Sequence, residues 1–141
     1  MSTLITNTFT GKTTAGSISV TGEGGSTTTN LQQGLGKCWV NFNGVGTIAA
    51  RDSFNMTSLT DNGTGDYTFA ITNDMSNATY VIQATSTQEA ANQPVISANP
   101  TNDSGLAAGT FRIELGFSNT GSNAMEQLDK KTYSAIFGDL A

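Results

Sequence analysis

Few side chains in this sequence could carry catalytic or metal chemistry. The chain has no histidine and a single cysteine, Cys38, among 141 residues. The lack of histidine excludes His-based catalytic triads, histidine metal sites and imidazole acid–base catalysis. Two carboxylates could still hydrolyse a glycan, but such enzymes usually hold their substrate in a long cleft, for which a domain this small has little room. We therefore expect a protein that is not an enzyme and that binds no cofactor.

A short segment near the start of the chain matches only part of a phosphate-binding motif. Gly11-Lys12-Thr13 ends like a P-loop, but Thr6 occupies the position of the first glycine of that motif. No apolar strand precedes it, as a P-loop would require. We expect no nucleotide site here.

The segment from residue 61 to residue 66 combines oxygen-bearing side chains with two glycines. Asn62-Gly63 can adopt the positive φ angles of a hairpin turn, which predicts that the turn is centred on this pair. The polar side chains of the segment then form a candidate outward-facing loop, which consists of Asp61, Asn62, Thr64 and Asp66. Three of these could also bring oxygens to a calcium ion, although the glycines remove ligands that an EF-hand loop would supply. Turn chemistry explains the same residues, so we expect no metal site and leave calcium as the alternative.

The chain carries little charge, and its balance is acidic. Charged residues make up 12% of the sequence, with eleven Asp and Glu against six Lys and Arg. Neutralising phosphates requires clustered cations, and Lys130-Lys131 is the only basic pair. No stretch approaches the ~18 apolar residues of a membrane span, and the N-terminus does not resemble a signal peptide. We expect no nucleic-acid partner, no membrane insertion and synthesis in a cytoplasm.

Most of the sequence after residue 36 alternates between apolar and polar side chains. The run that begins at Cys38 places Cys38, Val40 and Phe42 on one face, with Trp39, Asn41 and Asn43 on the other. A lone cysteine in this pattern excludes an intrachain disulfide and indicates a buried structural thiol. Residues 47–51 should continue this strand or pair with it.

A hairpin and several further strands follow. Residues 54–60 should pair with residues 66–72, and Tyr67, Phe69 and Ile71 should lie on one face of the return strand. We expect other strands at Thr79–Thr85, Gln93–Ala98, Thr110–Phe117 and Thr132–Phe137. Only Ala124–Lys131 has helix-forming content, which would give one or two turns.

Short strands separated by polar turns predict an all-β fold with one hydrophobic core. We expect a small antiparallel β-sandwich, jelly-roll-like, over residues 37–141. Residues 1–36 have too few apolar side chains to fold alone, and we expect an extended N-terminal segment for anchoring and oligomerisation. The apolar residues of this candidate assembly segment are Leu4, Ile5, Phe9, Ile18, Val20 and Leu31.

Aromatic side chains are the remaining candidates for ligand contacts. Trp39, Tyr67, Tyr80 and Tyr133 could stack on sugars if they are exposed. Aromatic residues in alternating strands are more often core or interface, and we favour that interpretation.

Several segments together resemble a module of tail-fibre-like proteins in marine tailed bacteriophages. The most specific are WVNFNG (Trp39–Gly44), RDSFN (Arg51–Asn55) and DNGTGDYT (Asp61–Thr68). The similarity covers roughly the first half to two-thirds of the chain, and the closing IFGDLA also resembles the ends of these proteins. None of these segments is a catalytic motif, so no active-site residue is carried over.

The resemblance implies a virion surface structural protein, made in the host cytoplasm and assembled as a homotrimer with other virion proteins of the tail or capsid. We expect a short tail-fibre-like adhesin that attaches to the particle by its N-terminal segment. Loops of its β domain, including residues 61–66 and 90–109, would contact a host surface glycan or protein. The alternative is a trimeric capsid decoration protein that stabilises the phage head. A glycan-cleaving tailspike is a minor alternative.

Overall fold

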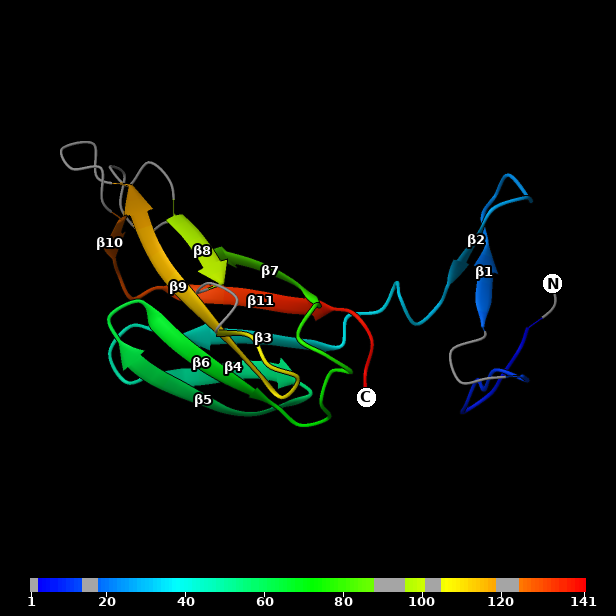
Figure 1. Cartoon of the computed structure of the whole chain (residues 1–141), viewed down its shortest axis with the longest axis horizontal. Coiled ribbons are helices and arrows are strands. Elements are labelled where there is room, and N and C mark those ends of the chain that lie inside the picture. Colours follow the sequence, from blue (N-terminus) through cyan, green and yellow to red (C-terminus); the bar gives the residue numbers. More distant parts are fainter. Residues whose placement is uncertain (1–2, 14–17, 88–95, 101–104, 119–124) are drawn as a thin grey trace. The chain divides into compact units, whose positions relative to one another are not determined.

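The computed structural model describes residues 3–13, 18–87, 96–100, 105–118 and 125–141. The chain forms two compact units, Met1–Leu35 and Gly36–Ala141 (Figure 1). Within the described residues the regular structure is β throughout, with no α-helix and therefore no helix that could span a membrane.

The N-terminal unit contains one short hairpin. Strands β1 (Ser19–Thr21) and β2 (Thr28–Asn30) pair antiparallel. The Gly22 N–H donates to the Thr27 carbonyl at 2.8 Å, and Gly25 takes a positive φ of 77° in the turn. A hairpin of three residues on each side is only marginally stable in water by itself.

The second unit is an antiparallel β-sandwich, which confirms the predicted fold class. Its first sheet has the order β4-β3-β11-β7. The four strands are β3 (Cys38–Asn43), β4 (Ala49–Phe54), β7 (Val81–Ser86) and β11 (Lys131–Phe137). The first and last strands of the unit pair at its centre, with Asn41 opposite Tyr133.

The second sheet is built around β9 (Thr110–Ser118). One edge of β9 pairs with β6 (Asp66–Ile71) and, further along, with β10 (Met125–Gln127); the other edge pairs with β8 (Ile96–Pro100). Strand β5 (Met56–Gly63) pairs with the outer edge of β6. The predicted hairpin of residues 54–72 is thus present as β5 and β6.

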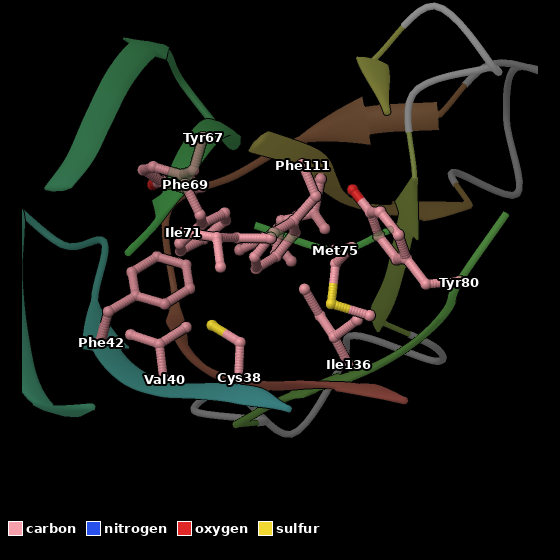
Figure 2. Close-up of a cluster of buried hydrophobic side chains, with 12 residues drawn as sticks. Cys38, Val40, Phe42, Tyr67, Phe69, Ile71, Met75, Tyr80, Phe111 and Ile136 are labelled. Carbon is pink, nitrogen blue, oxygen red and sulfur yellow. The ribbon is translucent and has the colours of Figure 1, made fainter. Parts of the chain in front are cut away.

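The core lies between the two sheets, where the predicted alternation places it. Cys38, Val40 and Phe42 point inward from β3, and β6 and β9 contribute the facing aromatic rings (Figure 2). The Phe42 ring meets those of Tyr67 and Phe69 edge-on, at centroid distances of 4.9 and 5.2 Å. Phe69 and Phe111 stack at 4.5 Å. These contacts are the offset and edge-to-face arrangements that aromatic rings prefer.

Asn55 forms the corner where the chain leaves the first sheet and enters the second. It has a left-handed φ of 57°, a conformation that asparagine tolerates better than most residues. Its side-chain amide donates to the carbonyls of Lys37 at 2.9 Å and Asn73 at 3.1 Å, and its Oδ1 accepts the Asn73 N–H at 2.8 Å. One side chain therefore connects the starts of two strands and the end of a third.

The predicted helical turns at residues 124–131 are wrong for the part of this segment that the structure describes. Residues 125–127 form β10, which pairs with β9 through Glu126 and Phe117, and residue 131 begins β11. A short stretch of helix-forming residues has weak local preference, and pairing with an existing strand outweighs it.

Candidate functional site

The candidate outward loop is organised differently from the prediction. Asp61, Asn62 and Gly63 belong to β5, and the tip of the hairpin consists of Thr64 and Gly65. Gly63 and Gly65 have positive φ angles of 137° and 68°, whereas Asn62 does not. The Asn62 side chain lies along the hairpin and donates to Thr68 Oγ1 at 2.8 Å. The prediction that the turn is centred on Asn62-Gly63 is therefore wrong by two residues.

Asp66 does not belong to the exposed part of the loop. Its residue surface is 8% exposed, and its carboxylate forms an ion pair with Arg112 on the neighbouring strand β9. The Arg112 guanidinium lowers the pKa of Asp66, because a hydrogen-bonded cation favours the ionised carboxylate. Of the four predicted loop residues, Asp61, Asn62 and Thr64 remain exposed.

Calcium chemistry gains no support from this geometry. Asp61 Oδ1 accepts the Gly63 N–H at 2.9 Å, and the Asp66 oxygens face Arg112. The described residues contain no group of three or more acidic, histidine or cysteine side chains that could hold a metal ion.

A partly buried polar network secures the tip of this hairpin, and no sequence motif indicates it. The Tyr67 hydroxyl donates to Asp129 Oδ1 at 2.6 Å, and the same oxygen accepts the Gly65 N–H at 2.7 Å. Burial, followed by the Asp129 carboxylate, raises the pKa of Tyr67. A Cβ on Gly65 would approach the Leu115 carbonyl oxygen to 2.5 Å. The network is structural, because each of its polar groups already has a partner within the fold.

The four aromatic candidates divide into two buried and two exposed residues. Tyr67 and Tyr80 lie in the core, where the Tyr80 hydroxyl lies 2.8 Å from the Thr110 carbonyl and 3.0 Å from that of Ala107. Burial raises the pKa of Tyr80 to about 12. Trp39 and Tyr133 are 39% and 40% exposed. The expectation of core or interface is confirmed for the first pair, whereas the second pair lies on the surface.

Trp39 and Tyr133 border a shallow hollow of about 440 Å³ on the outward side of the first sheet. The hollow extends over three adjacent strands, β3, β11 and β7. Its lining residues are Trp39, Val40, Asn41, Gln83, Ala84, Thr85, Tyr133, Ser134 and Ala135. None of them carries a formal charge.

The candidate assembly residues of the N-terminal unit are largely exposed. Leu4, Ile5 and Phe9 expose 75%, 90% and 63% of their surfaces, and Val20 is also exposed. Ile18 and Leu31 are half-buried. Phe9, Ile18 and Leu31 help to line a second hollow of about 410 Å³ within this unit.

The other predicted contact region, residues 90–109, is only partly described. Residues 90–95 and 101–104 lie outside the described residues, whereas residues 96–100 form β8. Residues 96–100 therefore pair with β9, whereas the described residues 105–109 lie outside the named strands.

Comparisons with protein-family models, with curated proteins and with solved structures gave no significant match to this chain.

Proposed function

We propose that this chain is a virion surface protein of a tailed bacteriophage, assembled as a short homotrimeric tail-fibre-like adhesin. The N-terminal unit attaches to identical copies and to other virion proteins, and the β-sandwich is displayed toward the host. The resemblance of residues 39–44, 51–55 and 61–68 to tail-fibre-like proteins supports the assignment to a phage.

The observation that carries the assembly role is the exposure of apolar side chains before residue 36. Leu4, Ile5 and Phe9 all have more than half of their surface in contact with water. Burying such side chains yields roughly 1.5–3 kcal/mol each, which a partner surface would provide. Identical copies arranged about an axis can cover the same side chains in every chain.

The first test measures the oligomeric state. The full chain should be a trimer by light scattering, and replacement of Ile5 and Phe9 by Asp should yield monomers that retain a folded sandwich. Thr57→Asp, at an exposed position in β5, is the matched control and should remain trimeric. A wild-type chain that stays monomeric at high concentration would contradict the trimer.

A second test locates the protein on the particle. Labelled copies confined to the tail, a few tens per particle, would support the fibre. Hundreds of copies over the head would reject it in favour of a capsid decoration protein. Deletion of residues 1–35 should abolish incorporation, and normal incorporation of the truncated chain would contradict the anchoring role.

A further inference from the structure

The outward side of sheet β4-β3-β11-β7 carries two aromatic rings beside uncharged polar groups. We call this surface the outer face and define it by Trp39, Asn41, Gln83, Thr85, Tyr133 and Ala135. These residues alternate with the inward-pointing core residues of the same three strands, because successive side chains of a strand point to opposite sides. The outer face therefore lies on the side of this sheet that points away from the core.

The pairing register explains why the outer face is hollow. Ala135 lies between Trp39 and Gln83, and Tyr133 lies between Asn41 and Thr85. Trp39 and Tyr133 are thus diagonal neighbours on adjacent strands, about 7–8 Å apart at their backbones. The single methyl group of Ala135 leaves space between larger side chains. The result is the floor and wall of the 440 Å³ hollow.

Two polar side chains of the outer face, those of Gln83 and Thr85, are available to a ligand. Within the described part of the chain, the side chains of Gln83 and Thr85 make no hydrogen bond to the protein, and both residues are exposed. Asn41 Oδ1 is covered and likewise has no partner among the described residues. A covered, unpaired amide oxygen is costly, and amide orientation can exchange it with the donor nitrogen. A ligand hydroxyl that reached this oxygen would relieve that cost.

Two aromatic rings next to amide and hydroxyl groups match the chemistry of a sugar. A pyranose ring presents an apolar C–H face, which stacks on an aromatic ring, and a rim of hydroxyls that both donate and accept hydrogen bonds. Anionic ligands are disfavoured, because none of the residues that line the hollow is a cation. Ligand sites in proteins commonly combine an apolar lining with a few polar groups in this way.

We infer that the outer face binds a neutral oligosaccharide. One sugar ring stacks on Trp39 and another on Tyr133, while Asn41, Gln83 and Thr85 bond their hydroxyls. The inference deepens the proposed adhesin role and rests on it, but it moves the contact from the hairpin loop to the face of a sheet. Weak binding by one copy would become firm attachment through several copies on one particle.

The test uses the full-length protein and its own fluorescence. Trp39 is the only tryptophan in the sequence, so a change in tryptophan emission reports on the outer face alone. Cellohexaose, laminarihexaose and mannohexaose are titrated, with polygalacturonate as the anionic comparison. We expect a saturable change with at least one neutral oligosaccharide and none with the polyanion. Absence of a saturable change with all three neutral probes, or a response to the polyanion alone, overturns the inference.

Variants assign the binding to the named residues. Tyr133→Ala should weaken affinity about tenfold, whereas Tyr133→Phe keeps the ring and should bind nearly as well as wild type. Val81→Ala is the matched control, since Val81 is exposed on β7 but does not line the hollow. Thermal melts establish that each variant is folded. Equal affinity for wild type and Tyr133→Ala would overturn the site.

Three outcomes separate this inference from the alternatives of a protein interface, of binding that depends on assembly, and of glycan cleavage. If Tyr133→Ala instead dissociates an oligomer, the outer face is an interface between copies and the sugar site is rejected. If the Ile5 and Phe9 variants are monomeric yet still bind the oligosaccharide, the inference stands independently of assembly. Unchanged oligosaccharide length after incubation is the expected result for a binding site, and shortening would replace binding with cleavage.

Discussion

The two units of the chain contain the same kinds of apolar side chain. In residues 1–35 these side chains are mostly exposed, whereas in residues 36–141 they form a buried core. Phe9 is exposed, whereas Phe69 is completely buried between two sheets. In the second unit the apolar residues recur at every other position of paired strands, so one face of each sheet becomes continuous. In the first unit the strands have three residues each, and neither β1 nor β2 has a buried position. Composition alone does not decide stability; the spacing of apolar residues along paired strands does.

The largest expected effect on stability comes from truncating one phenylalanine in each unit and comparing the two variants. Phe69→Ala should lower the free energy of unfolding by about 3–5 kcal/mol, because it removes a fully buried ring that contacts Phe42 and Phe111. Phe9→Ala should change the free energy of unfolding of the sandwich by less than about 0.5 kcal/mol. Urea denaturation of both variants measures the difference. Similar losses in the two variants would show that Phe9 is buried within the folded chain.

A pair of glycine substitutions tests the same contrast in the backbone. Gly65→Ala combines a left-handed φ with close contacts to the Leu115 carbonyl and the Leu128 amide, and should cost about 2 kcal/mol or more. Gly25→Ala has a similar φ but open space around it, and should cost about 1 kcal/mol within its own unit only. Thermal melts of the sandwich should therefore shift for the first variant alone. A Gly65→Ala sandwich that melts like wild type would contradict the close packing around the tip of the hairpin.

The smallest expected effect is on pH dependence. The pKa of Tyr80 rises from 10.0 to about 12 on burial, so the folded state holds the phenolic proton more tightly than the unfolded state. The stability that the folded state gains from protonated Tyr80 is complete below pH 10 and is lost as the pH rises toward 12. Burial raises the pKa of the Cys38 thiol to about 11, which acts in the same direction. Melting temperature measured against pH should fall in this window and fall less steeply for Tyr80→Phe, whereas an unchanged slope would exclude Tyr80 as a cause.

The sequence predicts strands well where apolar and polar residues alternate fully. It predicts them poorly where a strand forms only by pairing with a distant segment. The predicted strands that contain Cys38–Phe42, Tyr67–Ile71 and Phe111–Leu115 are present, because each segment has one apolar face. The prediction of helical turns around Met125 is wrong, because the strand there depends on pairing with β9.

The position of the hairpin turn and the composition of the outer face both depend on contacts between residues that are far apart in the sequence. Asp129 accepts the Gly65 N–H, which fixes the turn two residues beyond the expected pair. Alternation does place Trp39 opposite the core face of its strand. It gives no indication that Tyr133, 94 positions later, becomes its neighbour, because that contact follows from the β3–β11 register.

The pairing of β3 with β11 determines when the sandwich can fold during synthesis. Chains emerge from the ribosome from their N-terminus, and the centre of the first sheet joins Asn41 to Tyr133, near the end of the chain. Non-local pairing of this kind is slow, because the intervening chain must be ordered first. The N-terminal apolar residues are therefore synthesised well before the sandwich can close.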